Sequence, residues 1–94
     1  MAPSSHCQAV LVNTAGPDHQ GCLLFVDRRL VAVLVRLEQD AFLDPEFWGH
    51  WFLEAGFGPC QPRGRAPSFA TTDEALGWAR QQVEQYVREA VCLH

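Results

Sequence analysis

The sequence predicts an α+β domain in which an antiparallel meander of three to four strands packs on one C-terminal amphipathic helix, in the order β-β-β-β-α. Apolar runs separated by polar turns indicate the strands, and a one-sided apolar stripe behind a capping signal indicates the helix. Because the strands follow one another before the helix begins, the class is α+β rather than α/β. A chain of 94 residues fits a single domain. We divide it into a loose N-terminus (1–6), a sheet (8–55), a Gly/Pro/Arg loop (56–70) and a helix (71–92).

The first half of the chain contains three candidate strands. An apolar run over 8–13 is followed by a turn-rich connection, and the runs 21–27 and 30–38 are separated only by the polar residues at 27–29, which is hairpin spacing. Alternation along the third run predicts that one wholly apolar face points at the helix. The other face is apolar at one end only, so we expect the 40–50 segment or a second copy of the chain to cover it. The residues of the face expected to point at the helix are Val31, Val33, Val35 and Leu37.

Between the third and fourth strands, Asp44 can cap a short helical turn that begins at Pro45, where the missing N–H costs nothing. The fourth strand is predicted over 50–55. Three glycines and three prolines in 56–67 then exclude regular structure from that loop.

The helix has the strongest local signal. Thr71 and Glu74 form a capping box, in which the Thr71 hydroxyl accepts from the Glu74 N–H while Glu74 reaches back. An apolar stripe at intervals of three and four follows, and we expect it to lie on the sheet. Replacing Val83 by Asp should therefore unfold the domain. The stripe consists of Leu76, Ala79, Val83, Tyr86, Val87 and Ala90.

Composition excludes several classes of function. The chain is 48% hydrophobic and 19% charged with a net charge of −4, so neither a disordered chain nor a general nucleic-acid binder is expected. It contains no Lys, which excludes Schiff-base chemistry and a P-loop lysine. We interpret the absence of Lys and Ile as the coding bias of a GC-rich, bacterial genome.

The N-terminus has no basic residue and only a short apolar stretch, and no run is long enough to cross a bilayer, so we expect a cytoplasmic protein without a membrane partner. In that compartment the four cysteines should stay as thiols, with Cys22 and Cys92 as small core residues. His19 and Cys22 have a spacing seen in zinc sites, but one such pair is too little to predict a metal. We expect no cofactor.

Six aromatic residues lie between positions 42 and 57. Neighbours in a strand point to opposite faces, so Trp51 and Phe52 cannot both face the helix. We expect the remaining apolar surface to have one of three roles: it packs on the far side of the sheet, it forms a self-association surface, or it lines a pocket. Trp48, Trp51 and Phe52 are therefore candidate interface or ligand-binding residues.

Two weaker constellations follow the aromatic cluster. His50 and Glu54 have the strand spacing to share a face, and Cys60 lies just beyond, where a His–Cys pair could supply a thiolate. Arg63 and Arg65 flank a glycine and could grip a carboxylate or phosphate.

Our leading hypothesis is a small non-enzymatic interaction module whose partner is itself, as a homodimer, or another protein. The alternative is a small enzyme or small-molecule binder with its site near the 48–65 strand and loop. A third option, nucleic-acid binding, requires the arginines of the 27–29 turn and of the 56–70 loop to converge on one face.

Overall fold

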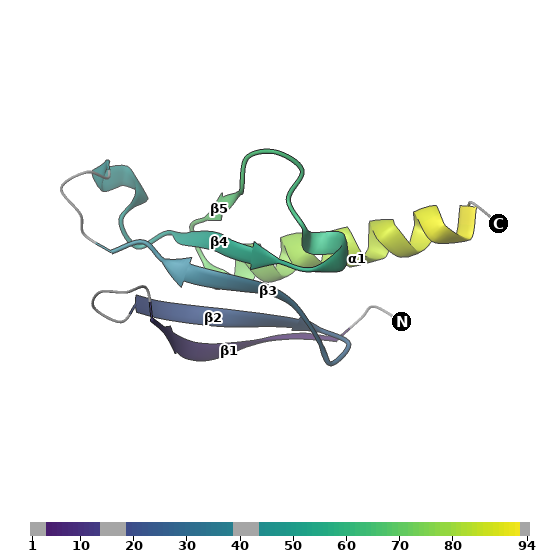
Figure 1. Cartoon of the computed structure of the whole chain (residues 1–94), viewed down its shortest axis with the longest axis horizontal. Coiled ribbons are helices and arrows are strands. Elements are labelled where there is room, and N and C mark those ends of the chain that lie inside the picture. Colours follow the sequence, from purple (N-terminus) through teal and green to yellow (C-terminus); the bar gives the residue numbers. More distant parts are fainter. Residues whose placement is uncertain (1–3, 14–18, 39–43, 93–94) are drawn as a thin grey trace.

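The computed structural model describes residues 4–13, 19–38 and 44–92, with the side chains described up to residue 89. It confirms the α+β class: a five-stranded antiparallel meander packs against one C-terminal helix (Figure 1). The strand order in the sheet follows the chain, β1-β2-β3-β4-β5. The elements are β1 (Ser5–Val12), β2 (His19–Val26), β3 (Arg29–Arg36), the 3-10 turn η1 (Pro45–Phe47), β4 (Trp51–Gly56), the 3-10 turn η2 (Gly58–Cys60), β5 (Ser68–Phe69) and α1 (Thr72–Cys92).

The sheet has one more strand than expected, and it begins earlier. β1 starts at Ser5, within the segment predicted to be loose, and pairs with β2 along its whole length. The loop predicted over 56–70 contains η2 and ends in β5, which pairs with β4 through Phe69 opposite Trp51. A two-residue strand has no period to detect, so local sequence could not reveal β5.

The β2–β3 connection is the predicted tight hairpin. Asp27 and Arg28 both have positive φ, 52° and 69°, which is the backbone of a type I′ turn. This turn matches the twist of the flanking strands, so Val26 pairs directly with Arg29.

The helix begins where the capping box predicts. The Glu74 N–H donates to the Thr71 hydroxyl over 3.1 Å, and the Glu74 carboxylate accepts from the N–H of Ala70 over 2.8 Å. Glu74 therefore reaches back one residue beyond Thr71. These two bonds satisfy backbone donors that the first turn and the residue before it would otherwise leave free.

The prediction of which face of β3 points at the helix is wrong. Leu34 and Ala32 are fully buried in the core beneath α1, whereas Val33 is half-buried and Val35 lies outside that core cluster. The middle of β3 is apolar on both faces, so its own pattern is ambiguous, and the neighbouring strands decide: Leu34 lies between Cys22 of β2 and Leu53 of β4. Val31 joins the core only because the register shifts by one residue beside it.

The far half of the helix stripe does not reach the sheet. Ala75 and Ala79 are buried and Val83 packs at the margin of the core, but Tyr86 and Val87 are 58% and 53% exposed. Figure 1 shows why, because α1 continues past the ends of the strands. The expectation that the whole stripe covers the sheet is therefore wrong after Val83, and the side chain of Ala90 lies outside the described residues. No helix in the described part of the chain is both long and apolar enough to cross a membrane.

Candidate functional site

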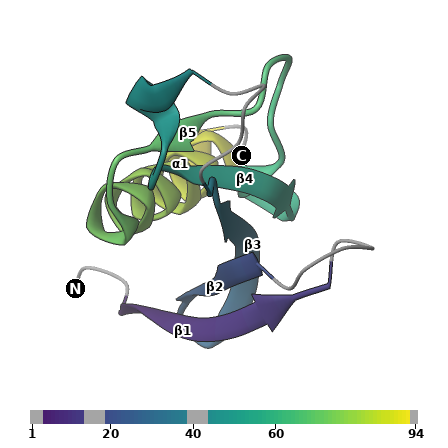
Figure 2. The same cartoon turned by 90° about the vertical axis from the view of Figure 1, so that its left-hand side faces the viewer.

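β1 forms an open edge of the sheet. It pairs with β2 on one side only, and Figure 2 shows it at the rim of the curved sheet, with no other described strand or helix beyond its outer edge. Its eight residues include no charged residue and no proline, the devices that commonly keep edge strands from pairing with other chains. Leu11, on this strand, is 71% exposed.

One hydrogen bond fixes which backbone groups of β1 face outward. Asp27 donates its N–H to the carbonyl oxygen of Ser4 over 2.8 Å, so Ser4 and Asp27 are a hydrogen-bonded pair in line with the β1–β2 register. Hydrogen-bonded and non-hydrogen-bonded pairs alternate along an antiparallel ladder. The odd residues of β1 therefore direct their N–H and C=O groups away from β2, and none of the other described residues pairs with these groups. They are Ser5, Cys7, Ala9 and Leu11.

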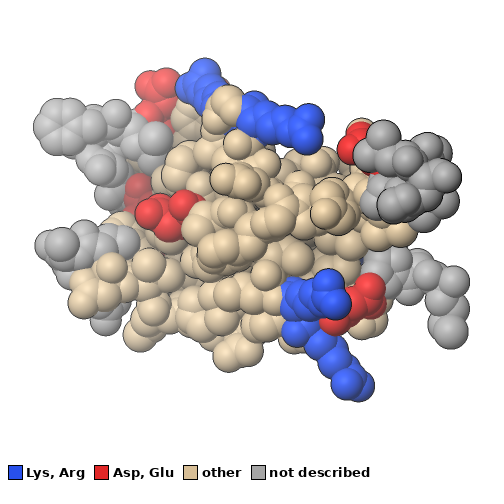
Figure 3. Space-filling view, turned by 45° about the vertical axis from the view of Figure 1, so that its right-hand side comes forward, with Lys and Arg blue, Asp and Glu red and all other residues tan. Residues whose placement is uncertain are grey.

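Next to this edge lies the helix-free face, which we define as the sheet positions on the side opposite α1. Its residues carry no Asp, Glu, Lys or Arg. Figure 3 shows a broad stretch of uncharged surface across the middle of the molecule, with the cationic side chains above and below it and acidic side chains toward both ends. The His6 ring stacks on Phe25 with centroids 4.8 Å apart. The face consists of His6, Gln8, Val10, Val12, His19, Gly21, Leu23, Phe25, Leu30, Val33, Val35, Phe52 and Ala55.

A disulfide joins the edge strand to its neighbour. Cys7 of β1 and Cys22 of β2 are diagonal neighbours with Cα atoms 6.0 Å apart, a separation that a disulfide spans without backbone movement. The prediction that all four cysteines are thiols is therefore wrong for this pair. The error arises because sequence spacing does not reveal which residues a strand register brings together. Cys22 is buried as predicted, and the side chain of Cys92 lies outside the described residues.

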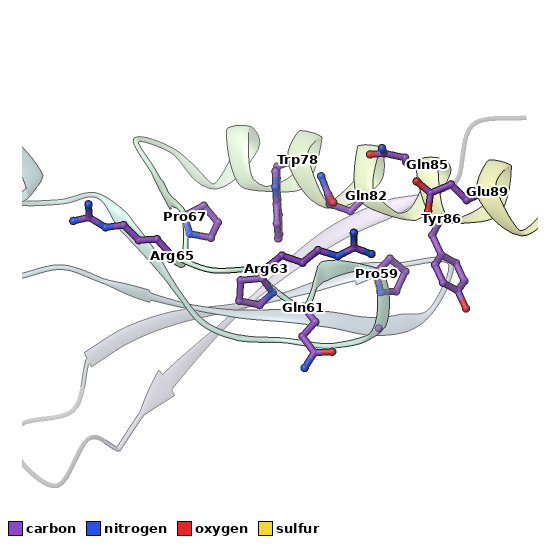
Figure 4. A pocket seen from close by; sticks show the side chains of 12 residues that line it. Pro59, Gln61, Arg63, Arg65, Pro67, Trp78, Gln82, Gln85, Tyr86 and Glu89 are labelled. Atoms are coloured by element: carbon purple, nitrogen blue, oxygen red, sulfur yellow. The ribbon is translucent and has the colours of Figure 1, made fainter.

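The second candidate site is a cavity of about 480 Å³ between α1 and the loop before β5, which we call the loop–helix groove. Trp78 and Tyr86 project into it from the helix, and Figure 4 shows Arg63 extending along it toward Pro59. Arg65 extends away from the groove in the same view. Neither guanidinium pairs with a carboxylate among the described residues, and both side chains are exposed. The rest of the wall is formed by prolines and by Gln61, Gln82, Gln85 and Glu89.

The structure separates the predicted His–Glu–Cys group. Cys60 is fully buried with its Sγ 3.9 Å from the carbonyl oxygen of Ala79, and burial raises the pKa of this thiol from 9.0 to about 11. The thiol is thus protonated near neutral pH and packs as a small apolar side chain. Glu54 is exposed at a β-bulge, where the extra residue breaks the alternation that would place it on the face of His50. The His50 ring packs edge-on against Phe47 with centroids 5.9 Å apart.

The aromatic cluster divides between the two faces of the sheet. Trp51 packs against the core on the helix side, and Phe52 lies on the helix-free face opposite Val35. Trp48 and Phe57 are 36% and 47% exposed, and Phe42 lies outside the described residues. Phe57 and Trp48 therefore belong to neither the core nor the loop–helix groove.

Other ligand classes find less support. The described residues contain no group of three or more His, Cys, Asp or Glu placed to hold a metal, and His19 and Cys22 point to opposite faces of β2. The cations visible in Figure 3 form separate groups at opposite margins rather than one basic surface.

Sequence reasoning missed three features of these sites. It did not identify the outward-facing residues of β1, the Cys7–Cys22 pair or the placement of Trp78 beside Arg63. The signal for the first was present, because an uncharged strand at the start of a meander must form one edge of its sheet. A scan against protein-family models, a search of curated proteins and a search of solved structures each find no match to this chain.

Proposed function

We propose that this protein is a non-enzymatic interaction module that acts as a homodimer and associates through the β1 edge. The observation that carries the proposal is the combination of an eight-residue edge strand, free of charge and proline and unpaired on its outer side by any other described residue, with an adjoining uncharged sheet face. A strand edge of this kind adds a further strand by main-chain hydrogen bonding, and flanking side chains provide selectivity.

The distribution of charged residues in this chain supports a partner whose contact surface is also uncharged. The chain carries a net charge of −4, so two copies repel weakly at long range. No residue of β1 or of the helix-free face carries a charged side chain, so a second copy meets no like charge from these positions. We propose that the protein acts in the cytoplasm.

Multi-angle light scattering across a micromolar concentration series tests this function. The expected mass is twice that of the 10.5 kDa chain at the upper end of the series. Ala9→Lys places a charge on the edge and should return the mass to that of one chain, whereas Gln81→Lys on the exposed face of α1 should leave the dimer intact. A wild-type mass of one chain throughout would contradict the proposal.

A second candidate function rests on the loop–helix groove. The Arg63 guanidinium, which pairs with no carboxylate among the described residues, lies in this groove with the half-buried ring of Trp78, a combination that suits an anion with an apolar body. Titration with phenyl phosphate, followed by the indole N–H resonance of Trp78, tests this candidate. Loss of the shift in Arg63→Gln would support it, and an unchanged resonance at millimolar ligand would oppose it.

A further inference from the structure

We infer that two copies pair β1 against β1 in one antiparallel register, with Ser5 of one copy opposite Leu11 of the other and Gln8 opposite Gln8 on the two-fold axis. This inference rests on the proposed function and goes beyond it, because it specifies the partner strand, its direction and its alignment. The result is a continuous sheet that crosses the dimer axis.

The direction and alignment follow from the outward-facing groups. In an antiparallel pair, residues that exchange both backbone hydrogen bonds lie directly opposite each other. Because the outward residues of β1 are 5, 7, 9 and 11, the pairs 5 with 11 and 7 with 9 use every one of them in both copies. A shift of two residues, with Ala9 opposite Ala9, leaves Ser5 without a partner inside the strand.

The side chains are compatible with this register. On the helix-free face, Val10 of one copy would lie beside the His6 ring of the other, and the two Gln8 amides would meet across the axis. His6 is already held by its stack on Phe25, so Val10 adds an apolar contact to an ordered ring. No position brings two like charges together, since β1 has none.

Room for the second copy exists on the described molecule. Figure 2 shows β1 at the rim of the curved sheet with no other described strand beyond its outer edge, and α1 contacts β1 from one face of the sheet. Helices of the two copies would lie on the same side of the joined sheet, because a two-fold axis perpendicular to the sheet keeps each face on its own side. The uncharged helix-free faces would then form one surface that extends over both copies.

Oxidative cross-linking of Gln8→Cys tests the register. Gln8 is exposed, and in the inferred β1–β1 pair it would occupy a non-hydrogen-bonded position, where opposed Cα atoms lie about 4.5 Å apart, within disulfide range. Every variant also carries Cys92→Ser; with Cys7 and Cys22 bonded and Cys60 buried, the new thiol is then the reactive one. We expect a covalent dimer linked through position 8, identified by peptide mass spectrometry, at least tenfold faster than for the exposed helix control Gln81→Cys.

Two further outcomes distinguish a wrong register from a wrong dimer interface. If Gln8→Cys cross-links only with Val10→Cys and not with itself, the register is shifted by two residues and the inference is wrong, although the edge still dimerises. If wild-type protein is dimeric by light scattering but Gln8→Cys cross-links no faster than Gln81→Cys, the β1–β1 contact is wrong. Isotope-filtered NOEs between Val10 methyls and the His6 ring of the other copy provide a check on the unmodified protein, and their absence in the dimer would also overturn the inference.

Discussion

The N–H of Asp27 donates to the carbonyl oxygen of Ser4 over 2.8 Å, and this bond fixes which backbone groups of β1 face away from β2. It makes Ser4 and Asp27 a hydrogen-bonded pair, and such pairs recur at every second residue of β1. The backbone groups of Gln8 therefore face Leu23 of β2, whereas those of Ala9 face away from β2. Ser4 also donates its own N–H to the Asp27 carboxylate over 3.1 Å, which fixes this end of the strand.

Proline substitutions distinguish the β1 residues whose N–H groups bond to β2 from those whose N–H groups face away from it. Gln8→Pro removes an N–H that bonds to β2 and should lower the free energy of unfolding by about 1–3 kcal/mol. Ala9→Pro removes an outward N–H and should cost the isolated fold much less while abolishing dimerisation. Urea unfolding below the dissociation concentration measures the first effect, and light scattering measures the second. Equal destabilisation by both substitutions would show that the assignment of inward and outward residues is wrong.

The Cys7–Cys22 bond should stabilise the fold. It closes a segment with a sequence separation of 15, for which the chain-entropy model gives about 3 kcal/mol. Reductant should therefore lower the midpoint of urea unfolding for the wild type and have no effect on Cys7→Ser/Cys22→Ala. Alkylation of unfolded protein without reductant, followed by intact-mass measurement, should leave both cysteines unmodified. Alkylation of Cys7 under these conditions would contradict the bond.

Cys60 should make stability depend on pH at the alkaline end. Its thiol ionises near pH 11 when folded and near pH 9.0 when exposed, so the unfolded state releases a proton that the folded state retains between these values. The stabilising contribution is complete below pH 9 and is lost as the pH rises toward 11, about 3 kcal/mol in total. Urea unfolding from pH 8 to 10.5 should show this slope in the wild type and a shallower one in Cys60→Ala. Parallel slopes would mean that Cys60 is not buried.

The N-cap should contribute measurably to the helix. Thr71→Ala removes the acceptor of the Glu74 N–H and should cost about 1 kcal/mol in unfolding free energy. Thr71→Ser keeps the hydroxyl and should therefore retain most of the unfolding free energy that Thr71→Ala loses. Thermal unfolding followed by circular dichroism compares the three proteins, and a Thr71→Ser protein as unstable as Thr71→Ala would show that the hydroxyl is not the stabilising group.

Features with a local cause were predictable from the sequence. The β2–β3 hairpin follows from a short polar break between two apolar runs, and the start of α1 follows from the spacing of Thr71 and Glu74. These signals need no knowledge of distant residues. The fold class followed from them, because consecutive strands before one helix leave few arrangements.

Features that depend on register were not predictable. The face of β3 that meets the helix is decided by Cys22 and Leu53 on neighbouring strands, and a one-residue shift would have reversed it. The same dependence hides the Cys7–Cys22 pair. The loop–helix groove exists because the chain returns through β5 to place Arg63 near Trp78, and that return depends on long-range pairing.

Amide hydrogen exchange across β1, resolved by NMR at concentrations below and above dimer formation, tests the central claim most directly. We predict that the amides of Cys7, Ala9 and Leu11 exchange rapidly in the monomer and become protected in the dimer, while those of Gln8 and Val10 are protected in both. Unchanged, rapid exchange of the odd residues in a dimeric sample would contradict pairing through this edge.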